Sequence, residues 1–230
     1  MFVSPVKVNE RKLNDRNNKT GSKRYACNRL GWLGRYRYRI YTIHSLMFSY
    51  IPIGSIDSFN ILKKKVFEIP PPEWKVWLER KKFKTQEDSD TILILNLAEK
   101  DHPLFNKTYF NEKYLTHLSL ELKECFDKIE SVYKNGEPKR VMLVSLPAGC
   151  NVKPHVDLGY HLQNCHRIHL PIITDKDVQF IVDGNIIPMC EGVLVEINNN
   201  VLHSVINRSL QNRVHLIIDW GSKNDAYYEE

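Results

Sequence analysis

The sequence lacks the paired cysteines and long apolar runs that mark several classes of protein. Its five cysteines are scattered and form no Cys-x-x-Cys pair, so neither a zinc cluster nor a disulfide framework is expected. The longest apolar-looking stretch, residues 46–56, is broken by polar residues, Pro52 and Gly54, and is far too short to span a bilayer. The charged N-terminus has no apolar core typical of a secretory signal. We therefore expect a reduced, cytoplasmic protein without a membrane span.

Positive charge is concentrated at the start of the chain. Residues 1–40 contain eleven Lys or Arg and two acids, a balance of +9, whereas the 230-residue chain carries +6, which leaves −3 for residues 41–230. We expect residues 1–40 to be a weakly ordered basic arm and residues 41–230 to be one domain. The run Arg35-Tyr-Arg-Tyr-Arg39 suggests weak polyanion binding through this arm, but an edge strand or a solvated tail is the simpler interpretation.

The domain has two parts with different patterns. Residues 41–138 suggest an irregular α/β lead-in, with a short helix at 73–82, a buried strand at 90–97 and a long amphipathic helix at about 111–134. Residues 139–221 form short strand-like segments separated by turn residues, and they suggest a jelly-roll core. The predicted strands are 140–146, 151–157, 166–173, 178–183, 193–197, 202–207 and 212–220. This pattern predicts a mainly β fold with flanking helices, a double-stranded β-helix of the jelly-roll or cupin type.

Three side chains in the second part have the spacing of a metal site. His155 and Asp157 are two residues apart, which places them on one face of a strand, and His203 follows 46 positions after Asp157. Two histidines and one carboxylate on one side of a metal leave the other side open, as in non-haem Fe(II) oxygenases. A lone histidine on a strand is more often structural than a ligand. The prediction therefore depends on finding the His155-x-Asp157 pair together with His203 and, ten residues later, Arg213.

Arg213 follows His203 by ten positions, in an otherwise apolar strand. If its guanidinium points inward it needs a buried anion, and its fork suits the distal carboxylate of 2-oxoglutarate; an outward, solvated Arg213 is the alternative. Arg167 and His169 form a second pair two residues apart, either reaching the same co-substrate or lying exposed.

The remaining histidines near these positions are expected to play lesser parts. His215 shares a strand face with Arg213 and is a candidate for lining the same pocket. His161 and His166 are assigned to loop and solvent.

The second part of the chain resembles the aspartyl/asparaginyl β-hydroxylase family of 2-oxoglutarate-dependent oxygenases. The resemblance covers roughly residues 140–221 and depends on five motifs. These are Pro154-His-Val-Asp157, Arg167-Ile-His169, Gly192-Val-Leu-Val-Glu-Ile-Asn198, His203-Ser-Val-Ile-Asn207 and Arg213-Val-His215.

The resemblance implies roles for individual residues. His155 and His203 would bind iron, Arg213 would hold the 2-oxoglutarate carboxylate, and Arg167 and His169 would contact the same co-substrate. A serine before the iron motif is a further contact in the family, and Ser145 is the nearest match, one position out of register. Asp157 is similar to the His-x-Asp of bacterial branches that hydroxylate free proline or lipid A, whereas the animal peptide hydroxylases lack this carboxylate.

The expected function is therefore an Fe(II)- and 2-oxoglutarate-dependent dioxygenase. It would use O2 to hydroxylate an amino acid, a peptide residue or another small molecule, and release succinate and CO2. A non-catalytic jelly-roll module or sensor that binds metal or 2-oxoglutarate is the alternative. A third hypothesis, compatible with either, makes the basic arm a tether to nucleic acid or a similar surface.

Overall fold

The computed structural model describes residues 48–75, 84–86, 88–98, 106–157 and 159–224. They all belong to one compact unit, Arg37–Glu230. The basic arm predicted for residues 1–40 and most of the helix predicted at 73–82 lie outside the described residues. Among the residues that the structure describes, no helix is both long and apolar enough to cross a membrane.

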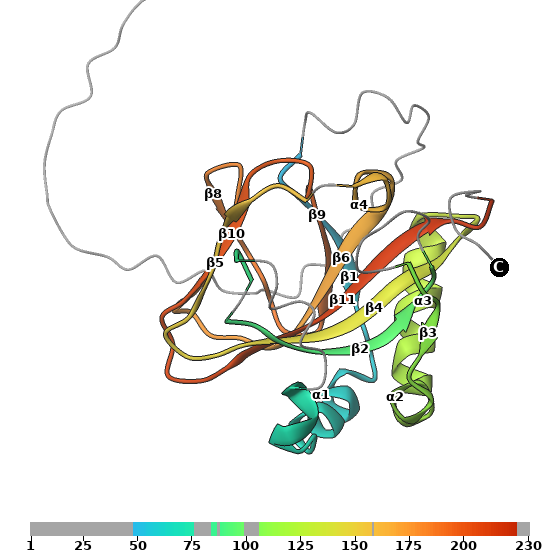
Figure 1. The fold of residues 1–230 in the computed structure, drawn as a ribbon, viewed down its shortest axis with the longest axis horizontal. Coiled ribbons are helices and arrows are strands. Elements are labelled where there is room, and N and C mark those ends of the chain that lie inside the picture. Colours follow the sequence, from blue (N-terminus) through green and yellow to red (C-terminus); the bar gives the residue numbers. More distant parts are fainter. Residues whose placement is uncertain (1–47, 76–83, 87, 99–105, 158, 225–230) are drawn as a thin grey trace, which may run out of the picture. The chain divides into compact units, whose positions relative to one another are not determined.

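Two antiparallel sheets make up most of the unit (Figure 1). The larger sheet has the strand order β1-β9-β6-β11-β4-β2-β3, with bounds Tyr50–Ser55, Val193–Ile197, His166–Ile173, Arg213–Ser222, Gly136–Leu146, Asp90–Asn96 and Tyr109–Phe110. The smaller sheet has the order β5-β10-β7-β8, with bounds Asn151–His155, His203–Asn207, Val178–Val182 and Asn185–Ile187. Leu146 and Ile197 of the larger sheet pack with Phe180 and Val205 of the smaller one, so the two sheets enclose a common interior. The predicted mainly β, jelly-roll class is confirmed.

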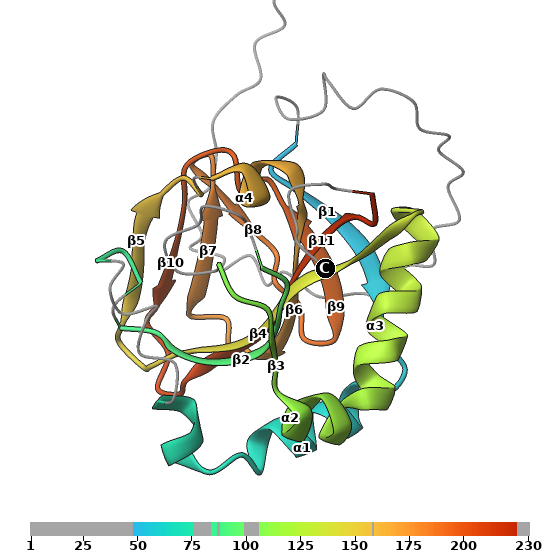
Figure 2. The same ribbon diagram turned by 45° about the vertical axis from the view of Figure 1, so that its right-hand side comes forward.

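Helices cover the outer face of the larger sheet (Figure 2). They are α1 (Phe59–Phe67), the 3-10 turn η2 (Pro71–Lys75), α2 (Glu112–His117) and α3 (Ser119–Val132); the short α4 (Tyr160–Asn164) precedes β6. Helix α3 buries Leu122, Cys125 and Ile129, at spacings of three and four residues, against that face. The single helix predicted at 111–134 is wrong in one respect, because the chain leaves helical geometry at Leu118 (φ −106°, ψ 15°) and forms two helices.

The lead-in predicted as irregular is more regular than expected. It contains β1 at the edge of the larger sheet and α1 on its outer face. The sequence suggests a reduced protein without a disulfide framework; Cys190 departs from this because it is disulfide-bonded, whereas Cys125, Cys150 and Cys165 carry free thiols.

Side chains of β6 and β11 alternate between the two faces of the larger sheet. On β6, Ile168 and Leu170 join the apolar core beneath the helices. His169 points the other way, since its ring meets Phe180 of the smaller sheet at 5.2 Å between centroids. On β11 the same alternation sends Leu216 to the helix side and Arg213 to the interior, where its guanidinium carbon lies 5.6 Å from the Phe180 ring. Polar residues of both strands therefore converge between the sheets.

Candidate metal centre

His155 and His203 face each other across two paired strands of the smaller sheet. They are direct partners in the β5–β10 register, and their ring centroids are 4.3 Å apart. His155 is the last residue of β5, and Asp157 follows two residues beyond the strand, where its backbone N–H donates to the Asn199 carbonyl at 3.2 Å. A turn contact outside the strand thus fixes the backbone that carries the carboxylate.

The structure brings the three predicted ligands together. One potential ligand atom from each of His155, Asp157 and His203 lies within 4.8 Å of the others. The carboxylate oxygens of Asp157 are 3.7 Å from His155 Nε2 and 3.8 Å from His203 Nε2. Imidazole nitrogens and a carboxylate oxygen at these separations can bind one divalent ion at bond lengths of about 2.0–2.2 Å.

Backbone carbonyls fix which nitrogen of each histidine is available. His155 Nδ1 is 2.7 Å from the Lys153 carbonyl, and His203 Nδ1 is 3.0 Å from the Val201 carbonyl. A carbonyl only accepts, so each Nδ1 carries the hydrogen and each Nε2 keeps its lone pair. Burial lowers the pKa of His203, which keeps its ring neutral as a metal ligand requires.

Gln86 is a neighbour of this site that the sequence did not indicate. Its side-chain Nε2 lies 3.1 Å from His155 Nε2. The segment before β2 is attached to β5 there, because the Lys153 N–H donates to the Thr85 carbonyl at 3.0 Å. No motif marks a lone glutamine 69 positions before the histidine that it contacts.

Arg213, His169 and His215 form a second polar cluster between the sheets. Arg213 Nη2 is 2.5 Å from His215 Nδ1, and His169 Nδ1 is 3.3 Å from the same nitrogen. Burial, followed by the charge of Arg213, holds the pKa of both histidines well below the ordinary value. An arginine only donates, so the neutral His215 ring carries its hydrogen on Nε2.

The outer nitrogens of this cluster need a ligand. Among the described residues, Nε2 of His169 and Nε2 of His215 are buried without a hydrogen-bond partner. A buried polar group left in this way costs about 1–3 kcal/mol. A polar ligand beside Arg213 would offset that cost.

Arg167 lies between Asp157 and a carboxylate that the sequence did not single out. Its guanidinium donates to Asp157 Oδ2 at 2.6 Å and to both oxygens of Asp219 at 2.8 and 2.9 Å. Burial alone would lower the pKa of Arg167, but these two carboxylates outweigh it and raise the pKa. Three of its five N–H groups are engaged in this way, and Arg167 thus contacts a predicted metal ligand directly.

His161 and His166 are not in loop and solvent, so both assignments are wrong. His161 lies in α4 with 1% of its surface exposed, and its Nε2 is 3.2 Å from Asp219 Oδ2. His166 begins β6, with Nδ1 2.7 Å from Glu196 Oε1 and its ring stacked on Tyr133. In both cases a carboxylate distant in sequence holds the imidazole, which is buried in His161 and half-buried in His166.

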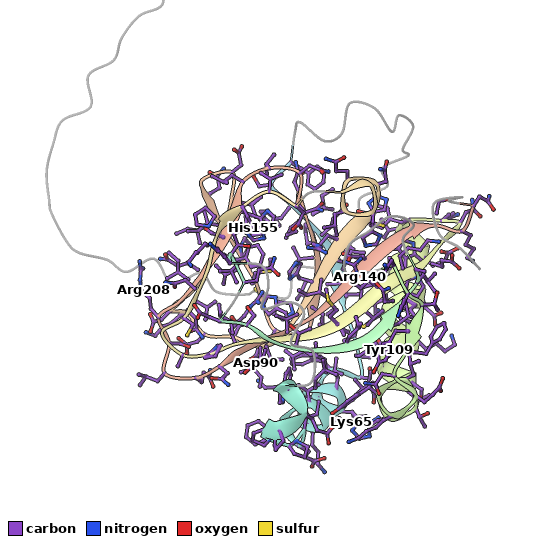
Figure 3. All side chains as sticks on the ribbon, in the orientation of Figure 1. Lys65, Asp90, Tyr109, Arg140, His155 and Arg208 are labelled. Carbon is purple, nitrogen blue, oxygen red and sulfur yellow. The ribbon has the colours of Figure 1, made fainter. Side chains whose placement is uncertain are left out.

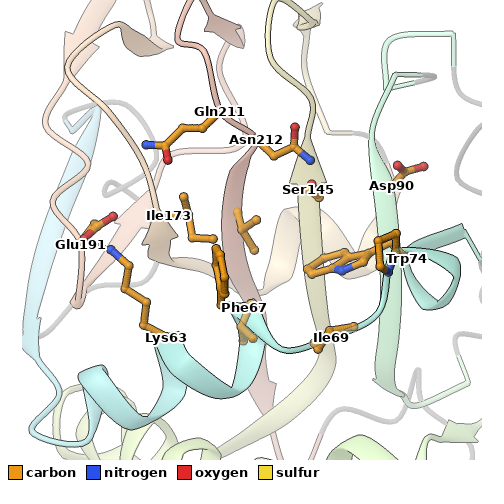
Figure 4. Close-up of a pocket in the computed structure, with 13 residues that line it drawn as sticks. Lys63, Phe67, Ile69, Trp74, Asp90, Ser145, Ile173, Glu191, Gln211 and Asn212 are labelled. Carbon is orange, nitrogen blue, oxygen red and sulfur yellow. Dashed lines mark hydrogen bonds and ion pairs between the residues drawn. The ribbon is translucent and has the colours of Figure 1, made fainter.

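Ser145 is not brought together with the other predicted site residues. It pairs with Val214 on β11, and Val214 belongs to the core on the helix side of the sheet. Its side chain lines a pocket of about 440 Å³ beneath α1, together with Trp74 and Asn212 (Figure 4). The sheet therefore separates Ser145 from the interior cluster.

The fold and the site define an enzyme of the 2-oxoglutarate/Fe(II) oxygenase type, and sequence comparison agrees. The family model for aspartyl/asparaginyl β-hydroxylases matches residues 100–222, more than half of the chain. The chain therefore belongs to the aspartyl/asparaginyl β-hydroxylase family. A search of curated proteins finds no relative.

Several solved structures have a similar chain path, as three examples show. A 2OG-Fe(II) oxygenase family oxidoreductase from Burkholderia pseudomallei is 11% identical, with 71% of this chain and 77% of that chain covered and a TM-score of 0.49. A prolyl-4-hydroxylase from Pseudomonas putida is 11% identical, with 77% of this chain and 95% of that chain covered and a TM-score of 0.45. HygX from Streptomyces hygroscopicus, solved with nickel, 2-oxoglutarate and hygromycin B, is 9% identical, with 78% of this chain and 84% of that chain covered and a TM-score of 0.47. Similarities at this level do not bear on substrate.

Proposed function

We propose that the protein is an Fe(II)- and 2-oxoglutarate-dependent dioxygenase that hydroxylates an amino acid, a peptide residue or another small molecule and releases succinate and CO2. The observation that carries this proposal is the convergence of His155, Asp157 and His203 within 4.8 Å. In both imidazoles Nδ1 meets a backbone carbonyl, which leaves Nε2 as the nitrogen for a metal, and Gln86 lies beside the Nε2 of His155.

In this proposal His155, Asp157 and His203 hold Fe(II). Bound iron supplies the coupling of O2 and 2-oxoglutarate oxidation to substrate hydroxylation. The chain's own contribution is to keep the His203 imidazole neutral, to present three ligands from one side, and to exclude water around them. His203 and Asp157 are 5% exposed, which fits the last of these tasks.

The interior cluster supports binding of the co-substrate. A buried guanidinium at Arg213 and a buried Nε2–H at His215 together offer donors to a carboxylate. His169 lies on the neighbouring strand, where its Nδ1 donates to the same His215 nitrogen; its buried Nε2 is then an acceptor and adds no donor for the carboxylate. We propose that this cluster receives the carboxylate of 2-oxoglutarate farther from the iron. Arg167 keeps two N–H groups beyond its three ion-pair contacts, so its predicted co-substrate contact also stays in the proposal.

The test is succinate formation from 2-oxoglutarate with Fe(II), ascorbate and O2. Wild-type protein is expected to form succinate, and His203→Ala is expected to form none, because two ligands do not retain the metal against water. His117→Ala, an exposed histidine of α2, is the matched control and should equal wild type. Turnover that persists in His203→Ala would refute the metal assignment.

The same assay separates the enzyme from the alternative. A wild-type protein that binds Co(II) and 2-oxoglutarate but never forms succinate would support a non-catalytic binding module. The cytoplasmic location, and polyanion binding through residues 1–40, stay predictions from the sequence; fractionation and a salt-dependent binding assay with and without residues 1–40 test them.

A further inference from the structure

Three neighbouring strands of the larger sheet carry a row of buried charges. Asp219 on β11 is the register partner of Arg140 on β4 and of Arg167 on β6. All three are buried, with Asp219 fully enclosed. Figure 3 labels Arg140 on the larger sheet and His155 on the smaller one. An arginine, an aspartate and an arginine therefore lie side by side at one level of the sheet.

Asp219 fixes the orientation of Arg167. The two form a bidentate pair, with Nε to Oδ1 at 2.8 Å and Nη2 to Oδ2 at 2.9 Å. Paired bonds of this type restrict rotation of the guanidinium plane as well as its distance. The remaining Nη1 is then directed at Asp157 Oδ2, which it meets at 2.6 Å.

Asp219 is itself held by other groups. His161 Nε2 lies 3.2 Å from Oδ2, and Arg140 Nη1 lies 3.9 Å from the same oxygen. Arg140 also donates from Nε to Asn96 Oδ1 at 3.1 Å. The carboxylate of Asp219 thus has little freedom to move, and neither has the guanidinium bound to it.

The chain of contacts ends on a predicted metal ligand. Asp157 lies outside a strand, and Arg167 is the partner of its side chain from the opposite sheet. Among the described residues, Oδ1 accepts no hydrogen bond and lies 3.7 Å from His155 Nε2. Oδ2 is therefore committed to Arg167 and also lies 3.8 Å from His203 Nε2, while Oδ1 faces His155 Nε2.

We propose that Asp219 is a positioning residue of the metal centre, which acts through Arg167 to hold Asp157 with Oδ1 directed at the metal. The inference rests on the proposed function, since it assumes a metal bound by His155, Asp157 and His203. The competing explanation is that Asp219 only neutralises Arg140 and Arg167 and stabilises the fold.

The test is the affinity for Co(II) alone, measured by titration of the full chain with visible absorption as the readout. Asp219→Asn replaces one acceptor oxygen by an NH2 group and so loses one of the two hydrogen bonds from Arg167. This variant is expected to weaken Co(II) binding by about 10- to 100-fold and to change the Co(II) spectrum at saturation. Asp183→Asn, in the exposed β7–β8 turn, is the matched control and should leave both unchanged. Circular dichroism establishes that each variant is folded.

A double-mutant cycle distinguishes positioning from general stabilisation. In an Asp157→Ala background, adding Asp219→Asn should change the Co(II) affinity by less than about threefold, because the carboxylate through which it acts is already removed. If Asp219→Asn fails to fold, Arg167→Lys takes its place, since it keeps the charge but loses the fork to Asp219; the same loss of affinity is expected.

The outcomes separate the two proposals. Wild-type protein that binds no Co(II) refutes the proposed function. Wild-type protein that binds Co(II), with folded Asp219→Asn or Arg167→Lys variants of equal affinity, overturns only the positioning role. A loss of affinity that is equally large in the Asp157→Ala background overturns it as well.

Discussion

The buried imidazole of His161 provides a test of the interior charge network by acid. Its Nε2 faces a carboxylate oxygen of Asp219, which only accepts, so the hydrogen of the neutral ring lies on Nε2. The other nitrogen, Nδ1, lies 3.5 Å from the Cys165 thiol. Burial, and then the charge of Arg140, lower the pKa of His161 to about 4 even though Asp219 opposes them.

The direction of the pH effect depends on which state binds the extra proton. The unfolded chain takes up a proton at His161 near the ordinary pKa of 6.5, whereas the folded chain resists it until about pH 4. Stability is therefore fully present above pH 6.5 and is lost as the pH falls through this window. From pH 7 to pH 5, these two pKa values correspond to a loss of about 2 kcal/mol from His161.

The assay is urea unfolding at pH 7 and pH 5, followed by circular dichroism. His161→Gln keeps an N–H donor for Asp219 but cannot titrate, so its stability should fall between the two pH values by about 2 kcal/mol less than that of wild type. The other buried histidines titrate in both proteins, so their contributions cancel in the comparison. His117→Gln, exposed on α2, should behave as wild type. An equal fall in His161→Gln and wild type would refute the assigned cause.

Two further predictions concern the co-substrate cluster and the core. Arg213→Lys should weaken 2-oxoglutarate binding about ten- to a hundredfold in calorimetry, since losing a desolvated fork costs about 1.5–3 kcal/mol; the exposed Arg208→Lys should bind as wild type, and equal affinities for the two variants would contradict the assignment. Leu170→Ala, in the core beneath the helices, should lower the free energy of unfolding by about 2–5 kcal/mol. Leu210→Ala, on a fully exposed side chain, should change it by under about 0.5 kcal/mol, and similar losses in both would refute the placement of that core.

Strands of the jelly-roll core were predictable because alternation and turn residues coincide there. Strands β6 and β9 begin and end where the sequence predicts, at His166–Ile173 and Val193–Ile197. Strand β1 escaped prediction because Pro52 and Gly54 argue against a strand interior. It is an edge strand with a register shift between these two residues, which is where sheets tolerate proline. Helix α1 buries only Leu62 and Val66, too few positions for a recognisable period.

The metal ligands were predictable because their signal is local. His155 and Asp157 are separated by one residue, and His203 lies just after a turn, at the start of another predicted strand. The predicted common strand face does not hold, because β5 ends at His155, but a separation of one residue still keeps the Asp157 side chain beside that of His155. Asp219 has no such signal, since its partners Arg140 and Arg167 are 79 and 52 positions away and meet it only through strand register.

Ser145 shows how far a one-residue difference in register changes the outcome. Arg213 is opposite Leu146, which packs into the interior between the sheets, whereas Ser145 is opposite Val214 in the core beneath the helices. Successive residues of a strand point to opposite faces, so a serine one position out of step reaches the wrong side of the sheet. Family resemblance specifies a residue type near a position, but only the pairing of β4 with β11 decides which face that residue occupies. A co-substrate contact from β4 would therefore have to come from the face of Val144 and Leu146, where this chain places apolar side chains.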